Sequence, residues 1–383
     1  MRTVALGEVA RIERHGVDPR DLPGETRYLG LEHIARGGRI IGSSTVAGAE
    51  LSSTKFLFTP EHVLFGKLRP NLGKVARPGF AGVCSTDILP IRPVAGLDRD
   101  YLAHYLVQPS MVDFAAARAT GANLPRLSPS TLVRFPVPVP DLADQRRIAA
   151  ILDAADAIRA KRRAQLAHLD DLPQAVFREI FGAPTSFQAK PLGEIATLTA
   201  GKSLVGEDLD AAAAFRVLKI SAVTSGLYRP GESKPLPMGY VPPEEHIVRA
   251  GDLLMSRANT ADLVGATALV VETPQYLALP DKIWRFVWRG SEIEPVYLHA
   301  FLSSAVARRK LSAMASGSGG SMKNISKAKL NRLDVPVPPL ALQQEFVTKV
   351  EAIHAERARV ARALEADDEL FAALQHRAFR GEL

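Results

Sequence analysis

The sequence contains a single cysteine, Cys84, among its 383 residues. One thiol excludes a disulfide within the chain and is typical of proteins in a reducing compartment. No stretch approaches the ~20 consecutive apolar residues that a membrane-spanning helix needs. The first residues, Met1 to Val4, lack the apolar core of a secretory signal. We therefore expect a cytoplasmic protein with no membrane partner.

The sequence also lacks the residue patterns of common catalytic and cofactor sites. Its nine histidines include no His-Glu-x-x-His pair, and one cysteine cannot build a thiolate zinc site. Gly201-Lys202-Ser203 resembles the end of a phosphate-binding loop, but Ala196 stands where that loop requires glycine. There is no glycine-rich dinucleotide loop and no Asn-Pro-Pro-aromatic tetrad of amino-methyltransferases. We therefore predict that this chain holds no catalytic residue, metal or cofactor, and that it acts in recognition.

Two long stretches with the pattern of coiled-coil helices are present instead. Residues 141–181 contain no glycine, and their apolar residues recur at alternating spacings of three and four, as they do again in residues 339–383. Arg162 interrupts the first apolar seam, and we expect Pro173 to kink or restart the helix. A long helix cannot bury its seam against itself, so we predict that the two stretches pair as antiparallel helices.

The chain repeats its organisation. Residues 6–10 recur at 192–196, and the Val-Pro-Val-Pro entrance at 137–140 recurs at 335–338. A strand is predicted at 83–91 and again at 277–288, aligning Asp87 with Asp281. Short strands, few helices and many Gly/Pro turns predict a mixed α/β or α+β fold in each half, without a doubly wound sheet. The expected molecule is a pseudo-twofold one with two similar globular domains and two long helices.

Several basic loops are candidates for binding nucleic acid. The chain carries a net charge of +7, which favours a polyanionic partner. Arginine and asparagine side chains can read guanine and adenine edges, while lysine, backbone amides and hydroxyl groups hold phosphates. The other interpretation of these loops is a solvated connector, and the basic cluster at 159–163 is interpreted as a solvated helix flank. The candidate DNA-contacting residues are Lys67, Arg69, Asn71, Lys74, Arg77, Asn123, Arg126, Lys202, Ser203, Arg257, Asn259, Ser321, Lys323 and Asn324.

The two Leu-Gly-Glu-[Val/Ile]-Ala starts, the two Val-Pro-Val-Pro-x-Leu-Ala-x-Gln entrances and the Ala-Phe-Arg-Gly-Glu-Leu tail resemble the specificity subunits of type I restriction-modification systems. The resemblance covers the whole chain. It implies target recognition domains at 1–140 and 183–338, each reading one part of a split sequence in double-stranded DNA. It implies spacer helices at 141–182 and 339–383. Lys323-Asn324 is close to the family pattern, whereas residues 123–128 depart from it.

The resemblance also implies partners. Two methyltransferase subunits, which hold S-adenosylmethionine, would dock on the helices, and a motor/nuclease subunit would add ATP-dependent cleavage. The specificity chain itself would be non-catalytic. The helix residues assigned to partner binding are Gln145, Ile148, Ile151, Ile158, Phe177, Gln343, Phe346, Val350, Ile353, Val360 and Phe379.

Two other classes stay open. The chain could be a non-catalytic tandem adaptor, with helices that bind a protein partner and globules that bind protein or RNA. It could also be an enzyme with an unfamiliar site. Salt-dependent binding to duplex DNA that requires a methyltransferase partner would distinguish the first interpretation from both.

Overall fold

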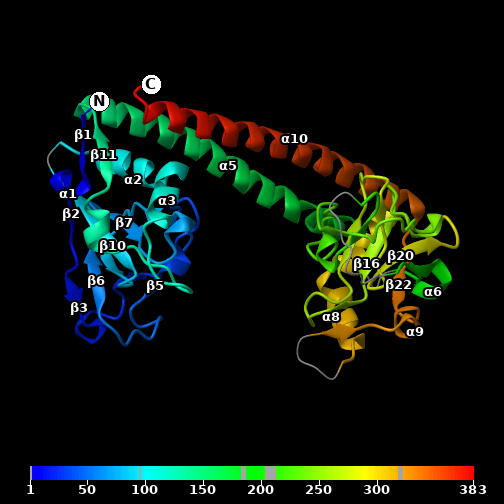
Figure 1. Ribbon diagram of the computed structural model, residues 1–383. Coiled ribbons are helices and arrows are strands. Elements are labelled where there is room, and N and C mark those ends of the chain that lie inside the picture. The colour runs from blue at the N-terminus through cyan, green and yellow to red at the C-terminus, as the bar shows by residue number, and fades with distance from the viewer. Residues whose placement is uncertain (1, 95, 183–186, 203–212, 318–321) are drawn as a thin grey trace. The chain divides into compact units, whose positions relative to one another are not determined.

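The computed structural model describes residues 2–94, 96–182, 187–202, 213–317 and 322–383. The chain forms two compact units: unit 1 is Met1–Arg163 with Arg362–Leu383, and unit 2 is Ala164–Ala361. Each unit combines β-sheets and short helices with parts of two long helices, α5 (Leu142–Phe181) and α10 (Leu340–Ala378) (Figure 1). The predicted mixed α+β class is confirmed.

Unit 1 has three sheets among its described residues, with strand orders β1-β11, β2-β10-β7-β8 and β3-β6-β9-β4-β5. The strands are β1 (Arg2–Ala5), β2 (Ala10–Ile12), β3 (Gly16–Val17), β4 (Arg27–Leu29), β5 (Ser44–Thr45), β6 (Lys55–Phe58), β7 (Val63–Gly66), β8 (Val75–Ala76), β9 (Gly82–Cys84), β10 (Ile88–Pro93) and β11 (Pro136–Val139). The short helices are α1 (Leu6–Val9), α2 (Arg99–Val107), α3 (Pro109–Ala116) and α4 (Pro129–Leu132), with 3-10 turns at Pro19–Asp21, Leu31–His33 and Pro70–Leu72.

Unit 2 has the sheet orders β12-β22, β13-β20-β16-β18, β15-β14-β19 and β17-β21 among its described residues. The strands are β12 (Ala189–Pro191), β13 (Ala196–Ala200), β14 (Arg216–Leu218), β15 (Ser233–Pro235), β16 (Leu253–Ser256), β17 (Ala258–Asn259), β18 (Thr267–Leu269), β19 (Leu277–Ala278), β20 (Ile283–Trp288), β21 (Lys323–Asn324) and β22 (Asp334–Pro336). The short helices are α6 (Leu192–Ile195), α7 (Pro295–Ser303), α8 (Ala305–Met314) and α9 (Lys327–Leu330), with 3-10 turns at Ile220–Ala222 and Glu244–His246.

The two units share the strand order of two of their sheets. In both, a strand from the start of the half pairs with the Val-Pro strand, β1 with β11 and β12 with β22. The four-stranded sheets follow the same order, and their registers match, because Ile88 faces Gly66 in unit 1 as Ile283 faces Ser256 in unit 2. The internal repeat therefore holds for these two pairs of sheets in strand order, and for the four-stranded sheets also in hydrogen-bonded register.

The predicted strands at 83–91 and 277–288 are each interrupted. Residues 85–87 separate β9 from β10, and the N–H of Ile88 donates to the carbonyl of Ser85 at 2.9 Å. Leu279 to Lys282 separate β19 from β20. The expectation of one continuous strand was wrong in both halves, because a turn at residues 86–87 and another at 281–282 interrupt the extended chain.

A buried glutamine fastens each long helix to its own unit. In unit 1 the Gln145 side chain accepts a bond from the Asp98 N–H at 2.8 Å and donates to the carbonyls of Gly96 and Pro140, both at 2.9 Å. Gln343 makes the same three bonds in unit 2, with Glu294, Glu292 and Pro338. Both glutamines are fully buried, so these bonds satisfy polar groups that no water reaches.

Aromatic cores surround these junctions. Tyr101 and Tyr297 are buried at equivalent places, and each hydroxyl donates to a proline carbonyl of the Val-Pro strand, Pro138 or Pro336, at 2.9 Å. Burial raises the pKa of both phenols, which therefore stay protonated donors. Phe379 packs on Tyr101 in unit 1, and Phe181 packs on Tyr297 in unit 2.

The long helices run antiparallel within each unit. In unit 1, Arg159 of α5 pairs with Asp368 of α10 at 2.5 Å, and Arg162 pairs with Asp367 at 2.6 Å. In unit 2, Arg357 of α10 pairs with Asp170 of α5 at 2.6 Å. Arg162 and Asp367, which break the apolar seams, thus meet each other. The interpretation of 159–163 as a solvated flank was wrong for Arg159, Arg162 and Arg163, because acids on the facing helix pair with all three.

Helix α5 continues through Pro173 to Phe181 and does not restart. Proline removes one backbone donor, but the turns on both sides remain helical. Phe177 and Phe181, just beyond the proline, are buried in the core of unit 2 with Phe346 of α10. This packing stabilises the last turns of α5 and explains why the predicted restart does not occur.

Candidate nucleic-acid interface

In unit 1, three segments meet where β7 ends and β10 begins, and we call residues 67–71, Asp87 and 120–127 corner 1. The Lys67 N–H donates to the Asp87 carbonyl at 2.9 Å, and the Leu127 N–H donates to the Lys67 carbonyl at 2.9 Å. The Arg69 N–H donates to the carbonyl of Pro125 at 2.7 Å. Backbone hydrogen bonds thus hold together two loops that the sequence separates by about fifty residues.

A carboxylate lies among the cations of corner 1. Arg126 donates to both oxygens of Asp87, from Nε at 3.1 Å and from Nη2 at 3.4 Å, and Lys67 Nζ lies 4.0 Å from the same carboxylate. Hydrogen bonding to Asp87 raises the pKa of Arg126. The Asp87 side chain is 25% exposed and that of Arg126 is 46% exposed, so both reach solvent.

Three further predicted residues lie at the surface of corner 1. Arg69 is exposed and adopts a left-handed conformation, with φ of 49°, as the residue before the Pro70–Leu72 turn. A non-glycine residue in this region is uncommon, and such residues concentrate at functional sites. Asn71 and Asn123 are also exposed.

Lys74 and Arg77 lie outside corner 1. Lys74 Nζ donates to the Leu31 carbonyl at 2.6 Å, and Arg77 bonds Asp153 of α5 at 2.6 Å with Asp100 3.4 Å away. His104 also binds Asp153 at 2.8 Å, and these hydrogen bonds lower the pKa of the Asp153 carboxyl against the opposing effect of its burial. Both cations therefore stabilise unit 1 internally.

Unit 2 contains an equivalent set of segments, residues 257–259, Lys282 and 316–317 with 322–325, which we call corner 2. The Arg257 N–H donates to the Lys282 carbonyl at 3.0 Å, and the Ile325 N–H donates to the Arg257 carbonyl at 3.0 Å. These two bonds repeat the Lys67 and Leu127 bonds of corner 1. They also correct the sequence alignment, because the structural counterpart of Asp87 is Lys282 and not Asp281.

Residues 120–127 of corner 1 and residues 316–317 with 322–325 of corner 2 match as well. Thr120 and Arg126 exchange backbone hydrogen bonds in corner 1, and Ser316 and Asn324 exchange them in corner 2. Each loop also exposes one large apolar side chain two residues earlier, Leu124 at 46% and Met322 at 45%. Arg126 and Asn324 are therefore equivalent positions that carry different side chains.

Buried polar atoms without partners lie beside corner 2. Within the described part of the chain, Arg257 Nε, Asp281 Oδ1 and Trp284 Nε1 are buried and make no hydrogen bond. The Arg257 guanidinium carbon lies 6.0 Å from the centre of the Trp284 ring. Such groups cost free energy unless something satisfies them, so this place is set up for interaction more than for stability.

The remaining predicted DNA-contacting residues divide by position. Asn259 and Lys323 pair backbone to backbone in β17 and β21 of corner 2. Lys202 is exposed and follows Gly201, whose N–H donates to the Pro280 carbonyl at 3.1 Å, close in sequence to Lys282. Ser203 and Ser321 lie outside the described residues.

The helix residues predicted to bind partners are mostly internal. Ile158 is 49% exposed, and Ile151, Ile353 and Phe379 are half-buried. The buried members are Gln145, Ile148, Phe177, Gln343, Phe346, Val350 and Val360. Of these, Ile148 lies in the core of unit 1, and Phe177, Phe346 and Val350 lie in the core of unit 2.

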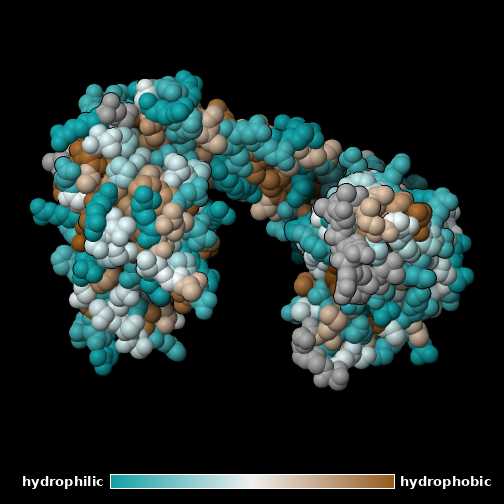
Figure 2. Space-filling model, viewed as in Figure 1, coloured by the Kyte–Doolittle hydropathy of each residue, from teal (hydrophilic) through white to brown (hydrophobic). Residues whose placement is uncertain are grey.

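Figure 2 shows hydrophilic side chains over most of the visible face of each unit, with hydrophobic side chains in small separate patches. No helix in the described ranges is long and apolar enough to cross a membrane. No cluster of three or more histidine, cysteine, aspartate or glutamate side chains suited to a metal was found among the residues that the structure describes.

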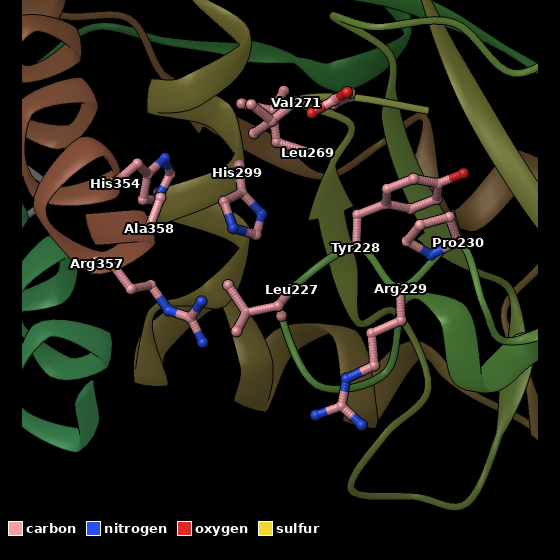
Figure 3. Close-up of a pocket in the computed structure, with 12 residues that line it drawn as sticks. Leu227, Tyr228, Arg229, Pro230, Leu269, Val271, His299, His354, Arg357 and Ala358 are labelled. Atoms are coloured by element: carbon pink, nitrogen blue, oxygen red, sulfur yellow. The ribbon is translucent and has the colours of Figure 1, made fainter. Parts of the chain in front are cut away.

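A cavity of about 450 Å³ lies in unit 2 between α7, α10 and residues 226–230. In Figure 3 the rings of His299 and His354 project into it from the two helices, with Arg357 beside them. His299 Nδ1 lies 2.9 Å from the Thr267 hydroxyl, and burial, with a smaller effect of His354, lowers the pKa of His299 to about 4. None of the residues singled out in the sequence as recognition candidates lines this cavity.

Asp87 was not among the predicted contacts because the sequence was searched for cations and amides, and Lys282 was passed over because Asp87 had been aligned with Asp281. The contribution of Asp87 and Lys282 is a difference in charge at one repeated position, which becomes visible only when the strand register is known.

Comparisons with known proteins agree with this geometry. Residues 1–168 match the family model "Type I restriction modification DNA specificity domain". The chain is 36% identical over 135 residues to the EcoEI type I restriction enzyme specificity subunit of Escherichia coli, covering 35% of this chain and 23% of that protein. It is 24% identical to the EcoKI specificity subunit of E. coli strain K12, covering 90% of this chain and 82% of that protein.

The matches with two of the curated relatives span only 23% and 48% of those proteins. A solved structure described as the "structural basis underlying complex assembly and conformational transition of the type I R-M system" has a TM-score of 0.60 at 20% identity. That alignment covers 100% of this chain and 98% of the solved one. At this identity the likeness concerns the fold. Residues 1–168 thus match a type I restriction modification DNA specificity domain, and the chain as a whole is similar to type I restriction enzyme specificity subunits.

Proposed function

We propose that this chain reads a bipartite DNA sequence, with unit 1 recognising one part through corner 1 and unit 2 recognising the other through corner 2. The observation that carries the proposal is the repeated construction of the corners. The same backbone bonds hold the same loops on four-stranded sheets of the same order. Two frameworks that agree in backbone and differ in side chains suit two readers of different sequences.

We further propose that α5 and α10 set the spacing between the two parts of the site and dock two methyltransferase subunits, with a motor/nuclease subunit joining for cleavage. Each long helix contributes residues to both units. Cross-helix ion pairs and buried glutamines stiffen the pair where it meets each unit. On this proposal the chain works in the cytoplasm and is non-catalytic. S-adenosylmethionine and ATP would bind to the partner subunits. The four segments predicted from the sequence, 1–140, 141–182, 183–338 and 339–383, remain the proposed division of labour.

Methylation mapping tests the proposal. The chain is co-expressed with its cognate methyltransferase subunit, and modified adenines in the cellular DNA are mapped by sequencing. We expect one bipartite sequence with a constant spacer. Failure to find modified DNA, or a single uninterrupted site, would contradict the proposal. A chain that bound RNA or protein and left DNA unmodified would favour the adaptor.

Matched insertions test the role of the helices. Four residues are added after Ala160 in α5 and after Asp367 in α10, which keeps the Arg159–Asp368 and Arg162–Asp367 pairs on either side of the insertion. Four residues lengthen a helix by about 6 Å, which is about two base pairs of duplex. The spacer in the modified sequence should grow accordingly. Insertion into α5 alone is the control and should abolish modification, because it breaks the pairing of the helices.

A further inference from the structure

Asp87 is the one carboxylate in the hydrogen-bonded network described for corner 1. Asp87 lies in the turn between β9 and β10, where its backbone N–H donates a hydrogen bond to the Ser85 hydroxyl at 3.3 Å. Arg126 donates to both oxygens of the carboxylate and Lys67 Nζ lies 4.0 Å from Oδ1, yet a quarter of the side chain is exposed. A carboxylate near a phosphate backbone is repelled unless it gains a donor from the nucleic acid. Arg126 and Lys67 offset part of this repulsion, and a base amino group in contact with Asp87 would offset more of it.

The same position in unit 2 carries the opposite charge. Lys282 occupies the place of Asp87, because its carbonyl accepts from Arg257 as that of Asp87 accepts from Lys67. The loop position beside it also differs between the units, because corner 1 carries Arg126 where corner 2 carries Asn324. The two corners thus share a backbone but offer different chemistry: corner 1 presents an acceptor flanked by donors, and corner 2 presents an ammonium beside an amide.

We propose that Asp87 is a specificity-determining residue that accepts a hydrogen bond from an exocyclic base amino group, cytosine N4 or adenine N6, in the half of the site read by unit 1. In the major groove, guanine O6 and N7 and thymine O4 are acceptors, so the carboxylate repels them and selects an amino group. Arg126, aligned by Asp87, donates to an acceptor on a neighbouring base or phosphate. Lys282 excludes amino-group recognition at the equivalent place in the other half. This inference rests on the proposed function.

The test uses Asp87→Asn with the cognate methyltransferase subunits and methylation mapping. The amide keeps the size of the side chain but adds a donor, so it also accepts bases that the carboxylate rejects. We expect modification of the original sequence to fall by about tenfold, and new sites to appear that differ at one base in one half only. Glu25→Gln is the control: this exposed acid lies in unit 1 outside corner 1, and its loss should leave the mapped sequence unchanged.

A purely structural role for Asp87 gives a different result. If the carboxylate only positions Arg126, Asp87→Asn modifies the same sequence less completely, and the proposal is overturned. An unchanged map overturns it too. The unsubstituted chain is mapped in the same experiment. If it modifies no bipartite site, the proposed function itself fails, whatever the variant does.

A reciprocal change covers the case in which Asp87→Asn does not fold. Lys282→Asp places a carboxylate at the equivalent position of unit 2, and we expect a changed base in the other half-site. Lys282→Gln removes the ammonium without adding a carboxylate, so bases that offer an amino group at this place should newly be accepted in the other half-site. An unchanged half-site with a folded Lys282→Asp chain would overturn the proposal.

Discussion

The two halves of the repeat agree where each globule meets the long helices and differ at the two corners. Gln145 and Gln343 make the same three hydrogen bonds, and Tyr101 and Tyr297 bond equivalent proline carbonyls. At the corners, Asp87 faces solvent in one unit and Lys282 takes its place in the other. The difference shows that buried side-chain bonds to the backbone constrain the junction, whereas the bonds that the two corners share are backbone bonds, which leave the side chains there free to vary.

The chain provides a separate probe for each unit, which makes this comparison measurable. Cys84, its one cysteine, is fully buried in unit 1, and burial raises the pKa of the thiol to about 12. The thiol therefore reacts only when unit 1 opens. Trp284 and Trp288, the two tryptophans of the chain, both lie in β20 of unit 2 and report on its unfolding.

The largest effect is expected from the buried glutamines. Gln145→Met and Gln343→Met each leave one backbone N–H and two carbonyls without a partner, at a cost on the order of 3 kcal/mol in the free energy of unfolding. Gln145→Met should speed Cys84 labelling, and Gln343→Met should lower the urea midpoint of tryptophan fluorescence. The exposed neighbour Gln344→Met is the control. Equal shifts of both probes in both variants would show that the units do not unfold separately.

The second largest effect is expected at acid pH, which should lower the stability of unit 2 through His299. Since the pKa of His299 is lowered to about 4 in the folded chain from an ordinary 6.5, the unfolded state binds the proton more readily. Stability of unit 2 is then complete above pH 6.5 and falls as the pH drops toward 4, by about 2 kcal/mol between pH 7 and pH 5. His354 and Arg357 on α10 line the same cavity, and Arg357 adds positive charge there.

The substitution His299→Leu tests whether His299 causes this pH dependence, because the leucine side chain cannot bind a proton. The pH-dependent part of the fluorescence midpoint should shrink between pH 7 and pH 5. A midpoint that depends on pH as strongly in this variant as in the wild type would assign the effect to other groups.

The buried tyrosines should give smaller and equal effects. Tyr101→Phe and Tyr297→Phe each remove one hydroxyl bond to a proline carbonyl, at a cost of about 1 kcal/mol. Cys84 labelling should report the first change and tryptophan fluorescence the second. A twofold or greater difference between the two costs would break the equivalence of the junctions.

The cross-helix ion pairs should have the smallest effect. Double-mutant cycles on Arg357 with Asp170 in unit 2, and on Arg159 with Asp368 in unit 1, should give couplings of about 0.2–1 kcal/mol, because these carboxylates are well exposed. The unit 1 pair should be the stronger, since Arg159 also bonds Asp156 and lies 4.2 Å from the Phe371 ring. Raising the salt concentration should weaken both couplings, and a salt-independent value would contradict an electrostatic origin.

Residue spacing alone was enough to predict the long antiparallel helices, the duplicated α+β halves and the loops that carry most of the candidate contacts. The heptad-like seams and the repeated Val-Pro-Val-Pro entrances are local patterns, and local patterns survive in the sequence. Arg126 and Asn324 were singled out for their residue types, and the structure places both at equivalent loop positions.

The rest depended on contacts between residues far apart in the chain. The carboxylate of Asp87 binds Arg126, which is 39 residues away in the sequence. Lys74 and Arg77 were predicted to contact DNA, but they bind Leu31 and Asp153 and lie outside corner 1. The helix continues through Pro173 because the core beyond it outweighs one missing backbone bond. The sequence by itself determined the repeat, the helices and the fold class, because periodicity and duplication are properties of a single chain read along its length. Which charges meet, and which remain at the surface to read a partner, only the tertiary structure decided, because that depends on strand register and on packing between distant segments.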